Sequence, residues 1–377
     1  KLLMLAFALV VSHSLSAQVK TYELRDFFKN AEKTRFQISP EGDLLSYLAP
    51  WNNRMNIHIQ KPGEKTATRI TSLTDRDISG YFWKNNSSLI YVRDFGGDEN
   101  FHLFVASTDG KTEKDLTPFK EVRVSIVDDL EDFPNEVLIQ MNKDNPEVFD
   151  VYRLNITTGD MKQVAKNPGN ISGWVTDHTG AIRAAVTTDG VESSLLVREK
   201  ETDEFKVLMT TDFRESVSPL FYTFDNKQLY AASNVGRDKQ AIVRINTSTG
   251  KEEELLFEHP EVDVTELNFS RKRKVLTSIG FETDKYEYTF LDKETESMYT
   301  KFQEELKGYH IAVTSKNKNE DKFLVRTYSD RSLGAYYMYD KATDKLTKLH
   351  EVSPWINEND MCEMQPVSYE ARDGKII

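Results

Sequence analysis

Apolar and polar residues alternate along most of this chain, in short runs separated by turn residues. A period of two is the pattern of β-strands that bury one face. Pairs of such runs flank turns rich in Asp, Thr and Gly, which predicts β-hairpins. One hairpin recurs seven times, as NIHIQKPGEKTATRI, LFVASTDGKTEKDL, VYRLNITTGDMKQV, LLVREKETDEFKVL, IVRINTSTGKEEEL, TFLDKETESMYTKF and YYMYDKATDKLTKL. The turns fall near Gly63, Gly110, Gly159, Asp203, Gly250, Glu296 and Asp344, so the unit repeats every 44 to 49 residues.

A second hairpin precedes each copy. These hairpins are RFQISPEGDLLSYLAP, GYFWKNNSSLIYVRD, DDLEDFPNEVLIQMN, GWVTDHTGAIRAAVT, FYTFDNKQLYAASN, LNFSRKRKVLTSIG and AVTSKNKNEDKFLVRTY. Each unit of about 45 residues therefore holds four antiparallel strands, the length and content of a propeller blade. The sequence predicts an all-β fold, a seven-bladed β-propeller of four-stranded antiparallel blades. The blades are expected at residues 34–73, 78–119, 121–165, 170–211, 217–257, 262–304 and 308–350. A pair of β-sandwiches is the alternative, but sandwiches lack this regular spacing.

Two segments flank the repeats. Residues 18–33 are interpreted as an N-terminal helical segment, because Leu24, Phe27 and Phe28 have helical spacing. The propeller itself is expected over residues 34–351, with every blade formed by one uninterrupted run of chain. Almost no helix is expected outside the N-terminal segment and the C-terminal linker.

Residues 352–377 follow the last blade as that linker and a C-terminal hairpin. They leave the last blade through Pro354 and Pro366 and end on PVSYEARDGKII. Asp-Gly between two strand-forming runs is a strong hairpin signal, yet the second arm, Lys375-Ile376-Ile377, has only three residues. The hairpin is therefore expected to open a further domain.

The first 17 residues predict an export signal. Lys1 is followed by an apolar stretch too short to span a membrane and by small residues that end at Ala17, the pattern of a secretory signal peptide. Cys362 is the only cysteine, so no internal disulfide can form. These features predict an exported protein, periplasmic or secreted.

The charge balance excludes two classes of partner. A formal net charge of −12 argues against nucleic acid and against an anionic membrane surface, because both attract Lys and Arg. The one basic run, Arg271-Lys272-Arg273-Lys274, falls where a turn is expected and is interpreted as a solvated loop.

No catalytic residues, cofactor or metal ligands are predicted. The Gly-x-Ser-x-Gly turn that holds a hydrolase nucleophile is absent from the sequence. The seven histidines are at least 40 residues apart, which excludes a local metal motif. Gly96-Gly97 is an isolated pair and not a phosphate-binding loop.

Three stretches carry a family resemblance. RDFGGDENFHLFV (93–105) contains the pattern Asp-x-x-Gly-Asp-Glu-Asn-x-x-Leu, YSDRSLGAYYMYDKATDKLTKL (328–349) spans the last blade, and PVSYEARDGKII follows it. In these stretches the sequence resembles the prolyl oligopeptidase family of serine peptidases (family S9), nearest its acylaminoacyl-peptidase branch. The resemblance implies a peptide substrate and an intramolecular α/β-hydrolase domain that carries a catalytic Ser, Asp and His. The resemblance also implies that residues 352–377 are the linker and the start of this hydrolase domain, which is truncated after its opening strands.

The strand order predicts which loops face such a domain. Connections between the second and third strands of a blade lie on the same face as connections between blades. The loops expected there are residues 50–56, 94–100, 143–149, 189–194, 234–240, 281–287 and 330–335. They are charged and contain glycine, as binding loops often are, although surface solubility explains the same composition.

Four residues of these loops are candidate site residues. Asp98, Glu99, Asn100 and Arg331 lie in the two family-like loops. The resemblance implies that they anchor the hydrolase domain by charged hydrogen bonds or meet the amino terminus of a peptide. His102 is expected to point into its blade beside Leu103.

Two functions remain open. The chain is either the substrate-gating and substrate-selecting propeller of an exported S9 serine peptidase, or a stand-alone periplasmic propeller that binds proteins or peptides without catalysis. The Arg372-Asp373-Gly374 hairpin favours the first function, because a free propeller has no use for it.

Overall fold

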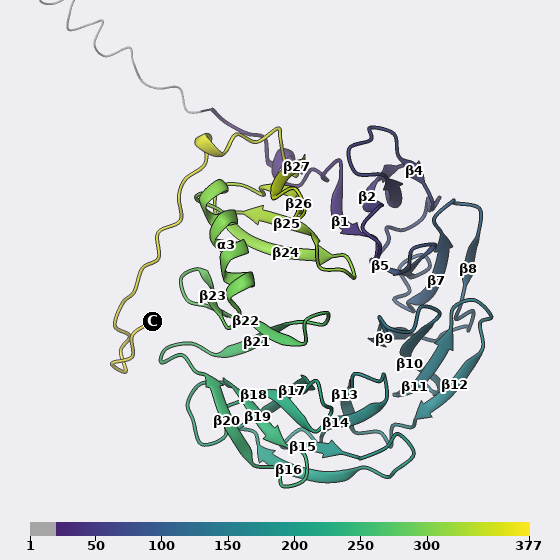
Figure 1. The fold of residues 1–377 in the computed structure, drawn as a ribbon, viewed down its shortest axis with the longest axis vertical. Helices are drawn as coiled ribbons and strands as arrows, with labels where there is room; N and C mark the ends of the chain where they lie inside the picture. The colour runs from purple at the N-terminus through teal and green to yellow at the C-terminus, as the bar shows by residue number, and fades with distance from the viewer. Residues whose placement is uncertain (1–19) are drawn as a thin grey trace, which may run out of the picture.

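In the computed structural model the chain forms a ring of seven antiparallel β-sheets (Figure 1). The structure describes residues 20–377, so the predicted signal peptide lies outside the described residues. Blade 1 contains β1 (Thr34–Ile38), β2 (Leu45–Trp51), β3 (Arg54–Gln60) and β4 (Thr68–Arg69). Blade 2 contains β5 (Gly80–Asn85), β6 (Ser88–Arg93), β7 (His102–Ser107) and β8 (Glu113–Asp115). Blade 3 contains β9 (Val124–Asp128), β10 (Glu136–Asn145), β11 (Val148–Asn155) and β12 (Met161–Ala165).

The ring continues through four more blades. Blade 4 contains β13 (Ile171–Thr176), β14 (Ile182–Thr188), β15 (Glu192–Val197) and β16 (Lys206–Asp212). Blade 5 contains β17 (Val217–Tyr222), β18 (Gln228–Ser233), β19 (Ala241–Asn246) and β20 (Glu252–Phe257). Blade 6 contains β21 (Val264–Ser270), β22 (Val275–Glu282) and β23 (Tyr286–Phe290). Blade 7 contains β24 (His310–Lys316), β25 (Lys322–Tyr328), β26 (Ala335–Asp340) and β27 (Lys345–Glu351). The predicted seven-bladed all-β propeller is therefore confirmed.

The apolar side chains that alternate along each strand meet between neighbouring blades. Ile90 and Leu103 of blade 2, for example, pack against Val137 and Ile139 of blade 3, and all four are fully buried. A single twisted sheet cannot bury both of its faces, and stacking against its neighbours in a ring removes this apolar surface from water.

The ring closes between blade 7 and blade 1 without a shared strand, because every blade is one continuous stretch of chain. Phe36 of β1 packs against Leu324 and Tyr336 of blade 7. The hydroxyl of Tyr336 also accepts a hydrogen bond of 3.0 Å from the backbone amide of Arg35. Side-chain packing and a few hydrogen bonds therefore form the closing seam.

Blade 6 departs from the prediction. The expected fourth strand and the expectation of almost no helix are wrong here, because α3 (Lys293–Glu305) replaces that strand. The backbone amide of Thr295 donates to the Asp292 carboxylate at 3.0 Å, which caps the first turn of the helix. Tyr299 and Phe302 are buried on one helical face against Phe323 and Tyr339 of blade 7. Helical spacing and the cap outweigh the alternation in this segment.

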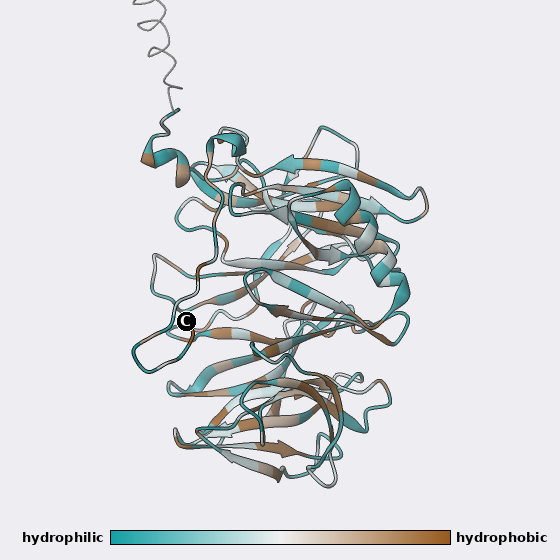
Figure 2. Cartoon of the chain, turned by 90° about the vertical axis from the view of Figure 1, so that its left-hand side faces the viewer, coloured by the Kyte–Doolittle hydropathy of each residue, from teal (hydrophilic) through white to brown (hydrophobic). Residues whose placement is uncertain are grey.

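The segments before and after the ring contact each other. The N-terminal segment contains one helical turn, α2 (Leu24–Phe27), and the linker contains a 3-10 turn, η1 (Glu358–Asp360). The Tyr22 hydroxyl donates to Asp360 at 2.6 Å, and the Trp355 indole donates to the carbonyl oxygen of Asp26 at 2.8 Å. Figure 2 shows α2 and the C-terminal tail on the same side of the ring. Within residues 20–377 no helix is both long enough and apolar enough to cross a membrane.

Candidate functional site

The loop face of the ring carries the candidate residues. The loop face is the side of the ring formed by the connections between second and third strands and by the connections between blades. The ring is entered at β1 and left at β27 on this face, so α2 and the C-terminal tail lie beside it (Figure 2). A partner joined to the end of the ring would meet this face first.

The blade 2 loop, residues 94–101, holds Asp98, Glu99 and Asn100 together. The Asp98 carboxylate accepts hydrogen bonds from the backbone amides of Phe95 at 3.3 Å and Asn100 at 3.1 Å. Glu99 has a φ of 59°, a left-handed conformation that exposes its side chain. Within residues 20–377 no hydrogen bond or ion pair engages the Glu99 carboxylate. Asp98 therefore shapes the loop, and Glu99 presents a free charge.

Asp94 fixes the base of this loop. Its buried carboxylate pairs with Arg76 at 3.0 Å and accepts a hydrogen bond of 3.3 Å from the backbone amide of Glu99. Burial alone would raise the pKa of Asp94, but the bonds from Arg76 and from the Glu99 amide hold that pKa below its usual value. The loop is therefore held by an ionised carboxylate at neutral pH.

His102 lies at the end of the same loop. It is 8% exposed beside Leu103, and its Nδ1 lies 2.8 Å from a carboxylate oxygen of Asp115. The ring of Phe95 packs edge-on against His102 with 5.1 Å between the ring centroids. The structure thus places His102 in the blade, where it supports the loop.

Arg331 lies in the blade 7 loop, residues 329–334, on the same face. Its backbone amide donates to the hydroxyl of Ser329 at 3.2 Å, and its side chain is exposed. Among the described residues no ion pair engages its guanidinium, and no hydrogen bond or ion pair joins it to the blade 2 loop, which lies on the other side of blade 1. The structure therefore brings Asp98, Glu99 and Asn100 together and keeps Arg331 apart.

Exposed apolar side chains also occur in several separate loops of the loop face. Phe213 between blades 4 and 5 is 79% exposed, and Val191 in the blade 4 loop is 62% exposed. Phe95, Tyr328 and Leu333 are exposed in the two family-like loops or at their edges. Sequence reasoning emphasised the charges of these loops and missed this set. The signal was a large apolar residue placed between strands, outside the alternation.

The C-terminal hairpin forms without a sheet to join. The backbone amides of Tyr369 and Ile377 donate to each other's carbonyl oxygens at 3.0 and 2.9 Å around the turn Arg372-Asp373-Gly374. Val367 is 83% exposed, and Tyr369 and Ile376 are exposed as well. A lone two-stranded hairpin is marginal in water, so these apolar groups lack a partner within residues 20–377.

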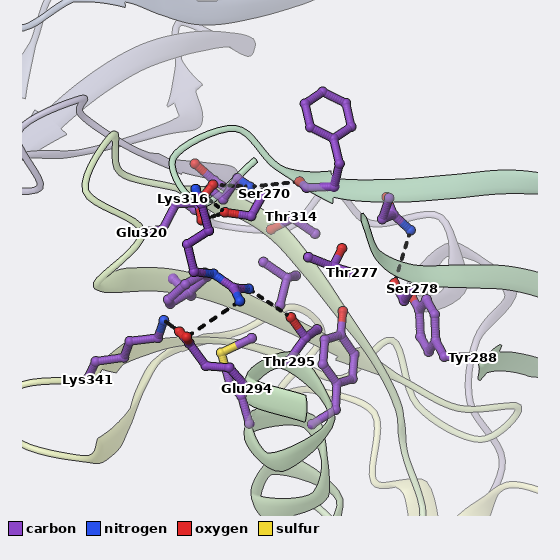
Figure 3. Close-up of a pocket in the computed structure, with 18 of the residues that line it drawn as sticks. Ser270, Thr277, Ser278, Tyr288, Glu294, Thr295, Thr314, Lys316, Glu320 and Lys341 are labelled. Atoms are coloured by element: carbon purple, nitrogen blue, oxygen red, sulfur yellow. Dashed lines mark hydrogen bonds and ion pairs between the residues drawn. The ribbon is translucent and has the colours of Figure 1, made fainter. Parts of the chain in front are cut away.

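Two cavities lie inside the ring rather than on the loop face. The first, of about 260 Å³, lies between blades 6 and 7, behind the start of α3 (Figure 3). Lys316 pairs with Glu320 at 2.7 Å there, and Glu294 pairs with Arg273 and Lys341. Because these charged groups pair with one another, they do not indicate a bound ligand in this cavity. The second cavity, of about 280 Å³, lies at the centre of the ring and is lined by blades 3 to 6.

The histidines of the described residues make few side-chain contacts with polar groups. The histidine hydrogen bonds within residues 20–377 run to backbone groups or to Asp115, and none joins a serine hydroxyl. In the same residues no three His, Cys, Asp or Glu side chains are grouped to hold a metal ion.

Known proteins related in sequence cover about twice the length of this chain. No family model matches the sequence. Dipeptidyl aminopeptidase BIII of Pseudoxanthomonas mexicana is 25% identical over 354 residues, which is 93% of this chain and 51% of that protein. Dipeptidyl peptidase family member 6 of Caenorhabditis elegans is 24% identical over 148 residues, 37% of this chain and 20% of that protein.

Solved structures share the fold. Prolyl oligopeptidase B from Galerina marginata superimposes with a TM-score of 0.62 at 12% identity, covering 93% of this chain and 56% of that one. A prolyl endopeptidase structure gives a TM-score of 0.64 at 10% identity, covering 93% and 54%. The chain is therefore a seven-bladed propeller that is related over 93% of its length to dipeptidyl aminopeptidase BIII and shares its fold with solved prolyl oligopeptidases.

Proposed function

We propose that this propeller gates and selects peptide substrates for an exported serine peptidase of the prolyl oligopeptidase type. In this proposal an α/β-hydrolase domain follows the hairpin at residues 366–377 and docks on the loop face. The observation that carries the proposal is that several loops of that face carry exposed apolar side chains, among which Phe213 is 79% and Val191 is 62% exposed. Contact with a docked domain would remove these side chains from water.

The related proteins support the same proposal. The chain spans about half the length of dipeptidyl aminopeptidase BIII, so that protein has a second half of similar size. Prolyl oligopeptidase B from Galerina marginata has been solved bound to a 25mer macrocyclization substrate, at a TM-score of 0.63 to this chain. Peptides are therefore the substrate class proposed here. The sequence pattern of residues 1–17 supports export.

Two free charges extend the proposed docking surface. Glu99 and Arg331 have exposed side chains without ion pairs in the described residues, and each lies beside exposed apolar groups, Phe95 and Leu333. Charged hydrogen bonds at the edge of an apolar contact fix orientation more than they add affinity. We assign both residues to docking.

Hydrogen exchange tests the proposal on two proteins, this chain and a longer chain that continues through a hydrolase domain. In the longer chain the amides of residues 94–100, 329–334 and 366–377 are expected to exchange more slowly. Glu99→Lys or Arg331→Glu should reverse part of that protection. Each change should cost about 1–3 kcal/mol of docking free energy if the charged group is desolvated by docking, and near zero if the group lies at the rim of the contact. Glu64→Lys, in the exposed turn between β3 and β4 on the opposite face, is the matched control.

The stand-alone binding propeller is the outcome that would replace this proposal. It requires residues 366–377 to be equally and strongly protected in both proteins, which would make the hairpin part of the propeller. Cleavage of peptidyl reporters by the longer chain, with none by this chain, would support the peptidase.

A further inference from the structure

One loop on the opposite face reaches across the centre of the ring. Residues 129–135 connect β9 to β10 in blade 3. With seven residues this loop is the longest of the connections between first and second strands, because the others have two to six residues between the strand ends. Its extra length lets its tip leave its own blade.

Three ion pairs hold the tip to distant blades. Glu131 pairs with Arg271 at 2.9 Å, and Asp132 pairs with Arg271 at 3.5 Å and with Lys318 at 3.4 Å. Arg271 lies in the β21–β22 turn of blade 6, and Lys318 lies in the β24–β25 turn of blade 7. Neither blade neighbours blade 3 in the ring, so these pairs span its central opening. The basic run interpreted from sequence as a solvated loop therefore supplies a contact across the axis.

Blade 2 anchors the base of the same loop. The buried Lys84 ammonium donates to the carbonyl oxygen of Leu130 at 2.8 Å and to that of Asp129. The Asn85 side-chain amide donates to the carbonyl oxygen of Pro134 at 2.9 Å. Leu130 is 3% exposed and packs close to Gly180, where an added Cβ would lie 2.8 Å from a Leu130 methyl group. The loop thus has a fixed base, and ion pairs hold the two side chains at its tip, Glu131 and Asp132.

The central cavity lies directly beneath this tip. Its walls include Phe133, Trp174, Phe221 and Phe269 from blades 3, 4, 5 and 6, and Arg271 lines it too. An extended peptide that passes along the ring axis on this face must pass the ion pairs. The aromatic side chains of the cavity walls can bury the apolar side chains of such a peptide.

We propose that Glu131, Asp132, Arg271 and Lys318 form a cross-axis tether that restricts which peptides pass through the propeller. This inference rests on the proposed function for its peptide substrate. The paired side chains are 34% to 58% exposed, and ion pairs this exposed are individually weak. The tether therefore opens without unfolding a blade, and it excludes long or bulky peptides more than short ones.

The first test uses this chain alone. Arg271→Glu removes two ion pairs and adds repulsion, so the amides of residues 130–133 should exchange about 3- to 10-fold faster. Lys274→Glu, in the same turn and without an ion pair in the described residues, should leave them unchanged. High salt should bring the wild-type rates toward those of Arg271→Glu, and the double variant Glu131→Arg with Arg271→Glu should restore part of the protection. Unchanged exchange in Arg271→Glu would overturn the tether.

A fold control keeps this test decisive. The melting temperature and the circular dichroism of Arg271→Glu are compared with those of Lys274→Glu. If Arg271→Glu fails to fold, the milder pair Glu131→Gln and Asp132→Asn removes those two ion pairs and the Asp132–Lys318 pair without adding repulsion. The amides of residues 130–133 are then expected to exchange faster as well.

The second test uses a longer chain that carries the hydrolase domain. Arg271→Glu is expected to raise kcat/KM for long peptides several-fold relative to short ones, with no such change in Lys274→Glu. An unchanged ratio in an active enzyme would overturn selection by the tether. If the wild-type longer chain cleaves no peptide, the proposed function fails instead, and the exchange test still decides whether the tether exists.

Discussion

At the residue scale, two glycines show that the two family-like loops differ in how much space they leave for an added side chain. Gly334 in the blade 7 loop has a φ of +65°, and an added Cβ would lie 2.0 Å from the carbonyl oxygen of Thr327. Gly96 in the blade 2 loop has a similar φ of +61° but nothing within 4 Å of the added Cβ. The backbone conformation is shared, and only Gly334 also meets a steric wall.

Gly334→Ala is therefore expected to destabilise the protein by more than about 2 kcal/mol, from the strained φ and the forced movement of the loop. Gly96→Ala is the matched control and should cost about 1 kcal/mol, the strain term alone. Denaturant unfolding measures both values. Equal losses of unfolding free energy in the two variants would mean that the blade 7 loop moves away from Thr327 at no energetic cost.

Asp94 offers a second residue-scale prediction, in which pH is the variable. Asp94→Asn removes a buried carboxylate that bonds Arg76 and the Glu99 amide, and we expect a loss of about 1–3 kcal/mol at neutral pH. Because the pKa of Asp94 in the folded protein lies below the usual value of an aspartate, the unfolded chain binds the proton first as pH falls. The difference in free energy of unfolding between the wild type and Asp94→Asn should have its full value above about pH 5 and should decrease as the pH falls toward about pH 3.

Unfolding free energies of both proteins at several pH values measure this difference. Asp98→Asn is the control, because its exposed carboxylate makes only loop hydrogen bonds. It should cost less than about 1 kcal/mol. A difference for Asp94→Asn that stays constant down to pH 3 would contradict the assigned charge state.

At the element scale, blade 6 combines three strands with a helix. The Asp292 carboxylate accepts the Thr295 amide at the helix start and also pairs with Arg273 at 2.7 Å. Hydrogen bonds from Arg273 and Thr295 hold the pKa of Asp292 well below its usual range. One side chain therefore caps α3 and ties it to the β21–β22 turn.

Asp292→Ala should destabilise α3 by about 1–3 kcal/mol, because both the cap and the pair are lost. Hydrogen exchange along residues 293–305 should accelerate before that of β21 and β22. The control Glu296→Ala changes an exposed acidic residue of the same turn that makes no ion pair in the described residues, and it should have little effect. If hydrogen exchange accelerates equally in α3, β21 and β22, the helix does not open separately from the strands of blade 6.

The same element shows what the sequence could and could not predict. Hairpins with clean alternation and Asp, Thr or Gly turns were predicted correctly, because a period of two is local information. The segment TFLDKETESMYTKF contains both periods, and packing of Tyr299 and Phe302 on blade 7 decides for a helix. The pairing of Glu131 with Arg271 had no local signal, because it depends on how far a loop reaches across the finished ring.

At the scale of the whole molecule, the closing seam is the contact that makes seven blades one ring. Phe36 is 3% exposed, and its ring centroid lies 4.9 Å from those of both Tyr47 and Tyr336. Phe36→Ala should cost about 3–5 kcal/mol and speed exchange in β1 and in β24 to β26. Leu195→Ala in blade 4 removes a comparably buried side chain away from the seam. If Leu195→Ala accelerates exchange at the seam as much as Phe36→Ala does, the ring opens as one unit.

The seam also orders events during synthesis. Six of the seven blade interfaces join residues that lie within neighbouring repeats, whereas β1 contacts β24 and β25 from nearly the whole length of the ring away. Contacts close in sequence form early, and a closure between distant segments waits for the last of them. As blade 7 leaves the ribosome last, blade 1 must keep the apolar face around Phe36 uncovered until then. A chaperone that binds exposed apolar strands would find its longest-lived target at β1.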